Sequence, residues 1–187
     1  DGAAVLECTR EKPTAKLIAA LAAKEGVKRM GFEERYMTVA EHTSSQKALD
    51  VELVPATALL DELRSVKDRA EVDALISAQR IAEKALTETL NFIRAGRTEK
   101  EISAFLQYQM LLGGAEKMSF EPIVVSGANS SMPHGVPTEK AVEAGDFVTM
   151  DFGCVYGGYC SDMTRTVAVG RVTEEMDRVY HTVLRAQ

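Results

Sequence analysis

The chain has 187 residues and a formal net charge of −6, with 22 basic side chains against 28 acidic ones. Apolar residues make up 45% and charged residues 27%, an ordinary globular composition that excludes a disordered or low-complexity chain. The excess of acidic residues argues against a nucleic-acid partner, and no apolar run reaches the about 20 residues of a membrane helix. The few cysteines form no disulfide scaffold, so we expect a cytoplasmic protein.

The first block, residues 1–64, alternates short helical and strand-like segments. Apolar residues at helical spacing predict a helix over 14–25, which Gly26 ends. Further along this block, the same criteria predict strands over 27–32 and 51–54, and helices over 38–49 and 58–63. Helices that alternate with short strands indicate a small α/β domain.

The second block, residues 65–187, opens with a long predicted helix. Ser65 with Asp68 forms an N-cap pattern, and apolar residues then recur at steps of three and four until Gly96. The capping box of Thr98 and Glu101 predicts a second helix, which stops at Gly113-Gly114. After Gly114 the period changes and predicts strands over 123–125, 147–152, 155–162 and 163–170, with a Gly- and Pro-rich loop over 127–137 and a final helix over 173–187.

Two aspartates mark the strand region as a candidate site. Asp151 ends an apolar strand, and a lone buried carboxylate costs several kcal/mol unless it is paired or coordinated. Asp162 is the next acid, and Gly157-Gly158 between the two signals a hairpin. If the turn is Tyr156-Gly157, the two carboxylates face each other across an antiparallel pair, with Cβ atoms about 5 Å apart.

Like charges at that distance repel, which leaves three interpretations of Asp151 and Asp162. The carboxylates share a proton, as a catalytic dyad does, or they jointly hold cations, as in sites with two metals about 3.5–4 Å apart. Alternatively both are structural, one capping a turn and the other meeting Arg165. Thr164 has the strand parity of Asp162, which suits a hydrogen-bond donor to the site, whereas Cys154 points the other way.

A family resemblance rests on the segments MPHGVP and DFVTMDFGCVYGGYCSDMTRTVAVG. Together they resemble the catalytic core of the pita-bread metallopeptidases, peptidase family M24, specifically the Xaa-Pro branch. The segment IVVSGANSSMPHGVPT resembles the substrate-binding loop of that family, and ELRSVKDRAEVDAL the start of its catalytic domain. The resemblance implies an α/β (α+β) fold, with part of a creatinase-like N-terminal domain over 1–64 and the first, antiparallel half of the pita-bread domain over 65–187.

The same resemblance implies a site with two divalent metal ions, manganese or cobalt, with zinc possible. Asp162 would bridge both ions and Asp151 would chelate one. His134 matches the loop histidine of the family, which contacts the substrate and stabilises the tetrahedral intermediate or positions the scissile carbonyl. Its near-neutral pKa in model peptides suits that role. Without the downstream motif, His134 would be a solvated loop histidine.

The function implied is a metal-dependent exopeptidase, an Xaa-Pro dipeptidase or aminopeptidase P, in which metal-activated hydroxide attacks the bond before proline. The expected partners are a peptide with proline at its second position and a second copy of the chain. In the family, a second half supplies a His, two Glu ligands and a general base. We therefore expect the 187 residues to be inactive alone, with exposed apolar strands over 121–125 and 147–152 that need a cover.

Two other functions compete with this one. Methionine aminopeptidase shares the fold and metals. It is disfavoured by the proline before His134, the sequence MDFG and the N-terminal block. A pita-bread domain without metal, acting as a binding module or hydrolysing creatine, is the second alternative. The presence of both Asp151 and Asp162 argues against it.

Overall fold

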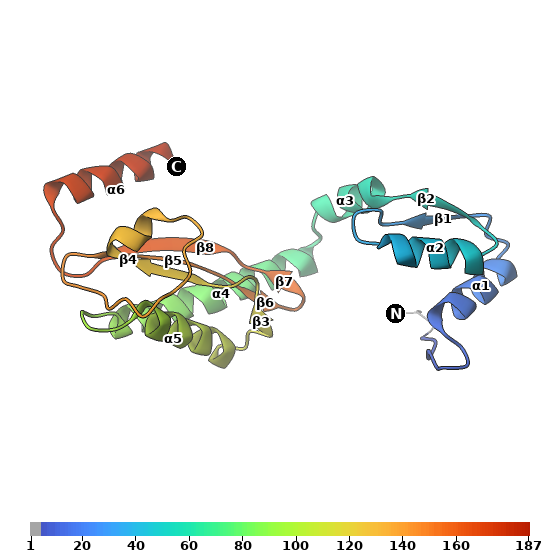
Figure 1. Ribbon diagram of the computed structural model, residues 1–187, viewed down its shortest axis with the longest axis horizontal. Coiled ribbons are helices and arrows are strands. Elements are labelled where there is room, and N and C mark those ends of the chain that lie inside the picture. Colours follow the sequence, from blue (N-terminus) through green and yellow to red (C-terminus); the bar gives the residue numbers. More distant parts are fainter. Residues whose placement is uncertain (1–4) are drawn as a thin grey trace. The chain divides into compact units, whose positions relative to one another are not determined.

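The computed structural model of the protein describes residues 5–187. The chain divides into two compact units, Asp1–Lys67 and Asp68–Gln187, whose elements are labelled in Figure 1. Both units mix helices and strands, and the strands of the second unit pair in an antiparallel manner, which confirms the predicted class. Within the described residues, every helix is too short or too polar to span a lipid bilayer.

The first unit is built around two short parallel strands. Its elements are α1 (Thr14–Lys24), β1 (Arg29–Phe32), α2 (Val39–Ala48), β2 (Glu52–Pro55) and α3 (Thr57–Ser65). β1 pairs with β2 in parallel, so β1, α2 and β2 form a β-α-β unit. Thr38 and Glu41 form a capping box that begins α2. The predicted alternation of helices and strands is confirmed.

The helices of the second unit are α4 (Arg69–Phe92), α5 (Glu99–Leu112) and α6 (Glu174–Ala186). The capping box of Thr98 and Glu101 begins α5 as predicted. The predicted cap of α4 was wrong, because Asp68 is the N-cap and forms its capping box with Glu71. Ser65 instead ends α3, where its hydroxyl donates to the carbonyl of Glu62.

The strands of the second unit form two antiparallel sheets. They are β3 (Lys117–Met118), β4 (Ile123–Ser126), β5 (Phe147–Phe152), β6 (Cys154–Tyr156), β7 (Tyr159–Cys160) and β8 (Met163–Ala168). The sheet orders are β4-β5-β8 and β3-β6-β7. One long hairpin therefore contributes to both sheets, because β5 runs on into β6 and β7 runs on into β8. The sequence did not predict β3.

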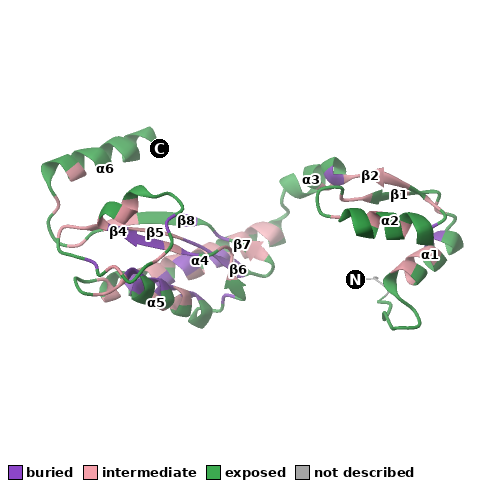
Figure 2. Ribbon diagram, in the orientation of Figure 1, coloured by how far each residue is buried: buried purple, intermediate pink, exposed green. Residues whose placement is uncertain are grey.

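The hydrophobic core of the second unit lies between its two sheets and the helices α4 and α5 (Figure 2). Alternate residues of β5 are buried, with Val148, Met150 and Phe152 at 0% exposure. The expectation that the apolar strands lie exposed was wrong, since this chain's own helices cover their core face and a loop packs on Val125 of the other face. The other face of β5 carries Thr149 and Asp151, which are half-buried.

Candidate active site

Asp151 lies in β5, which pairs with β8, the strand that follows Asp162. The two aspartates are not directly opposite each other. Asp151 in β5 faces Thr164 in β8, so the predicted register was wrong by two positions. The reason is the turn. Gly157 and Gly158, with φ of 58° and 79°, form its two central residues, and this tight turn requires left-handed backbone at both positions. Tyr156 would be strained there.

A shift of two positions keeps every side chain on its predicted face of the sheet. Asp162 precedes Thr164 by two residues and is thus a diagonal neighbour of Asp151, a relation that sets Cα atoms about 7–8 Å apart. Its neighbours Ser161 and Met163 are both 5% exposed and face the core, whereas Asp162 is exposed. Both aspartates therefore point to the sheet face away from the core.

The strand is interrupted at Ser161 and Asp162, between β7 and β8, where the Ser161 hydroxyl takes the place of its carbonyl as hydrogen-bond acceptor. This hydroxyl accepts a hydrogen bond from the backbone N–H of Cys154 at 3.0 Å, and the Ser161 N–H donates to the Cys154 carbonyl at 2.9 Å. The Ser161 carbonyl instead accepts from the hydroxyl of Ser119 at 2.8 Å. Gly153 makes room for this carbonyl, since a Cβ there would collide with its oxygen. Cys154 is buried, away from the two aspartates, as predicted.

Thr164 fixes one of the carboxylates. Its hydroxyl donates to Oδ1 of Asp151 at 2.7 Å, so the expected donor is present and its acceptor is Asp151. Arg165 donates from Nη1 to the carbonyl of Thr164 at 2.7 Å. Among residues 5–187 it forms no salt bridge with either aspartate, which removes the support for the structural interpretation that relied on Arg165.

If Asp151 is a metal ligand, as the sequence predicts, replacing Thr164 with valine is expected to lower activity or metal affinity about 10–100-fold, because the donor that orients this carboxylate is lost. The measurement is kcat/KM together with metal content in the natural full-length protein. Thr166→Val is the matched control. The Thr166 hydroxyl lies 3.0 Å from that of Thr149 on the same sheet and has no bond to Asp151. Equal losses in the two variants would contradict the orienting role.

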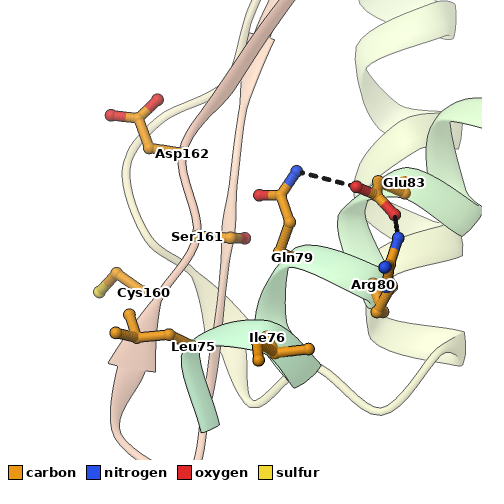
Figure 3. A pocket seen from close by; sticks show the side chains of 8 residues that line it. All are labelled: Leu75, Ile76, Gln79, Arg80, Glu83, Cys160, Ser161 and Asp162. Carbon is orange, nitrogen blue, oxygen red and sulfur yellow. Dashed lines mark hydrogen bonds and ion pairs between the residues drawn. The ribbon is translucent and has the colours of Figure 1, made fainter. Parts of the chain in front are cut away.

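A pocket of about 370 Å³ lies beside Asp162, between α4 and the strand junction (Figure 3). Its lining residues are Leu75, Ile76, Gln79, Arg80, Glu83, Cys160, Ser161 and Asp162. In Figure 3 the Asp162 carboxylate points away from α4, whereas Glu83 is held by Arg80 and Gln79. The hydrogen bond from Arg80 lowers the pKa of Glu83. Within the described part of the chain, no three His, Cys, Asp or Glu side chains gather as a metal-binding group.

His134 occupies a turn that follows β4 and the short helix η1 (Gly127–Ser131). The N–H of Gly135 donates to the carbonyl of Met132 at 3.1 Å, so Pro133 and His134 are the central residues of a β-turn. Proline suits the first central position because its ring fixes φ near the required value. The His134 side chain is exposed.

The turn of His134 lies on the sheet face that carries the aspartates. A Cβ on Gly135 would come within 2.7 Å of Cγ1 of Val125, so this turn packs directly on Val125. Val125 pairs with Thr149, and directly opposed residues share a face. Asp151 shares that face two positions along the strand, a rise of about 7 Å.

Glu99 carries no signal in the sequence that marks it as functional, yet this residue is 0% exposed and its carboxylate is fully hydrogen-bonded. Oε1 accepts from Ser126 N–H at 2.6 Å, Ser126 Oγ at 2.9 Å and Asn129 Nδ2 at 3.1 Å. Oε2 accepts from Thr138 N–H at 3.0 Å and Thr138 Oγ1 at 2.7 Å. Burial alone raises the pKa of Glu99, but these donors together outweigh it and hold the pKa below its usual value.

Sequence profiles assign both parts of the chain. The metallopeptidase family M24 profile matches residues 73–187, and the creatinase/prolidase N-terminal domain profile matches residues 2–66. The chain belongs to metallopeptidase family M24. It is 42% identical over 163 residues to the uncharacterized peptidase YqhT of Bacillus subtilis, a match that covers 87% of this chain and 46% of that protein.

Named peptidases are among the other relatives. The chain is 36% identical over 165 residues to the Xaa-Pro dipeptidase of Pyrococcus horikoshii, covering 88% of this chain and 47% of the relative. The solved structure of an Xaa-Pro dipeptidase from Bacillus anthracis superposes with a TM-score of 0.88 at 41% identity, over 92% of this chain and 48% of that one. The structure of an X-Pro aminopeptidase from Thermotoga maritima superposes with a TM-score of 0.89 at 35% identity, over 95% of this chain and 51% of that one. The chain thus spans about half the length of these relatives.

Proposed function

We propose that the natural protein is a metal-dependent exopeptidase that hydrolyses the peptide bond before proline, as an Xaa-Pro dipeptidase or aminopeptidase. One observation carries the proposal: Asp151 and Asp162 point to one sheet face, and the turn of His134 packs on that same face. The names of the relatives from Bacillus anthracis and Pyrococcus horikoshii support the substrate class. The proposal includes a creatinase-like domain over 1–64 and the first half of the pita-bread domain over 65–187.

Asp151 and Asp162 fit part of a site for two divalent ions, for which we propose manganese or cobalt, with zinc as a further option. Carboxylates are hard oxygen donors suited to such ions, and Asp151 is already oriented by Thr164. When bound, divalent ions polarise a carbonyl and lower the pKa of water. The two aspartates contribute the negative charge that balances the ions, and Thr164 keeps one of them in a single orientation.

His134 is proposed to contact the substrate and to donate a hydrogen bond to the oxygen of the scissile carbonyl. Its exposed position in a tight turn leaves the imidazole accessible to a peptide. An imidazole ring offers one nitrogen that donates a hydrogen bond and one that accepts. The role is that of a preorganised donor toward developing negative charge.

His134→Ala is expected to lower the turnover of an Xaa-Pro substrate about 10²–10³-fold, the usual effect of one lost hydrogen bond to a developing oxyanion. Metal content should stay nearly unchanged, because His134 is not a proposed ligand. The two measurements are kcat and elemental analysis of the purified natural protein. A fall in metal content in step with activity would show that His134 is a ligand.

The proposed function is tested by comparing an Xaa-Pro dipeptide, a longer Xaa-Pro peptide and the same peptides with alanine in place of proline. Proline-dependent cleavage supports the proposal, and the length preference separates dipeptidase from aminopeptidase. Cleavage after an N-terminal methionine without need for proline, or hydrolysis of creatine, would replace it. The match of residues 2–66 to the creatinase/prolidase N-terminal domain disfavours methionine aminopeptidase. The homodimer and the cytoplasmic location stay predictions.

A further inference from the structure

Glu99 joins the two ends of the loop that carries His134. Oε1 accepts hydrogen bonds from Ser126 and Asn129, at the start of the loop, and Oε2 accepts from Thr138, at its end. A carboxylate with 0% exposure is costly to bury, and five short hydrogen-bond donors offset that cost here. The conformation of both loop ends is therefore tied to one side chain.

The backbone around Glu99 strengthens the connection at the end of the loop. Glu99 is the first residue of α5, where N–H groups have no partner within the helix. Its N–H donates to the carbonyl of Lys140 at 3.0 Å, and the N–H of Lys100 donates to the carbonyl of Thr138 at 3.1 Å. The start of a helix also favours a negative charge at this position.

The start of the loop is held by a second charged pair. Nζ of Lys140 donates to Oγ of Ser126 at 3.1 Å and to Oδ2 of Asp146 at 2.8 Å, so a cation lies one hydroxyl away from the buried carboxylate of Glu99. Gly127 has φ of 55°, and a Cβ there would come within 2.7 Å of Oδ1 of Asp146. The backbone angle and the close approach of Asp146 thus both require glycine at position 127.

We propose that Glu99 is a positioning residue, which acts on turnover by holding both ends of the 127–137 loop and thereby the turn of His134 on the sheet face of Asp151. The inference rests on the proposed function, because it assigns Glu99 an effect that passes through His134. It does not require Glu99 to touch substrate or metal.

The test is a double-mutant cycle of Glu99→Gln and His134→Ala in the natural full-length protein. Glutamine replaces one acceptor oxygen by an amide that faces other donors, so the loop loses one of its two attachments. Glu99→Gln is expected to lower kcat about 10–100-fold in the parent and to cause no further loss in the His134→Ala background. Amide hydrogen exchange over 127–138 should become faster in both backgrounds.

Glu101→Gln is the matched control for the cycle. Glu101 lies in the same helical turn, but its exposed carboxylate completes the cap with Thr98 and pairs with Arg97, and it has no hydrogen bond to the loop. This variant should lower the melting temperature without changing kcat at permissive temperature. If Glu99→Gln prevents folding, Thr138→Val takes its place in the cycle. It removes the hydroxyl that donates to Glu99 and accepts from the N–H of Lys140, and it is expected to lower kcat about 3–10-fold, again only when His134 is present.

Three results would overturn the inference. Equal losses of kcat in the two backgrounds would show that Glu99 does not act through His134, while the role of His134 itself would stand. If Glu99→Gln in the parent background leaves kcat unchanged while amide hydrogen exchange over 127–138 becomes faster, turnover does not require the loop ends to be held. A His134→Ala variant with normal kcat would remove the proposed role of His134 and the role of Glu99 with it.

Discussion

Asp162→Asn is expected to abolish Xaa-Pro hydrolysis in the natural full-length protein without disturbing its fold. Asp162 is exposed, and within the described residues its carboxylate has no hydrogen bond or ion pair, so stability should change by about 0.5 kcal/mol or less. Activity should fall at least about 10³-fold if Asp162 is the anionic metal ligand that we propose, because its loss would remove several kcal/mol of transition-state stabilisation. The measurements are kcat/KM, metal content and melting temperature.

Glu83→Gln is the control for this prediction. Glu83 lines the same pocket as Asp162, but Arg80 and Gln79 already satisfy it. Its substitution removes the same charge from the same surface and should leave kcat/KM within a few-fold of the parent. Comparable losses in the two variants would mean that general electrostatics of the pocket, rather than a ligand carboxylate, supports activity.

The local elements of the fold were predictable because their signals lie within a few residues of one another. The capping box of Thr98 and Glu101 and the alternation of β5 depend on neighbours alone. The start of α4 was ambiguous, since Ser65 and Asp68 are both good caps, and the choice depends on the partner Glu71. A strand as short as β3 carries no periodicity and exists only through its pairing with β6.

The faces of the candidate site were predicted correctly, but its register was not. Two adjacent glycines indicate a hairpin, and either Tyr156-Gly157 or Gly157-Gly158 gives Asp151 and Asp162 the same face. The glycine pair itself favours the second turn, because both central residues need positive φ and tyrosine is strained there. The diagonal relation that results separates the carboxylates further than direct opposition would, which reduces their repulsion and leaves more room for cations between them.

Glu99 could not be found from the sequence for a different reason. An acid in the first turn of a helix is common and is normally exposed. Its burial depends on Ser126, Asn129 and Thr138, which reach it only after the loop folds back on α5. Such a site is recognised only in the folded structure, where donors that are distant in the sequence meet one carboxylate. Neither residue spacing nor composition predicts that contact.

Gly153→Ala is expected to destabilise the second unit by about 3 kcal/mol or more, a fall in melting temperature of roughly 10 °C. The added Cβ would collide with the carbonyl oxygen of Ser161 and lie 2.5 Å from the hydroxyl of Ser119. Because backbone rather than a flexible side chain blocks the space, the hairpin must move, and Asp162 follows directly after Ser161. Activity at permissive temperature should therefore fall as well.

Gly158→Ala separates this steric effect from the general cost of replacing a hairpin glycine. Gly158 has φ of 79° and nothing within 4 Å of its added Cβ, so only the left-handed backbone is penalised, at about 1–2 kcal/mol. Thermal unfolding followed by circular dichroism compares the two variants under the same conditions. An equal loss in both would show that the junction of β7 and β8 adapts to a side chain. In that case the close packing of Gly153 against Ser161 would not be what sets the position of Asp162.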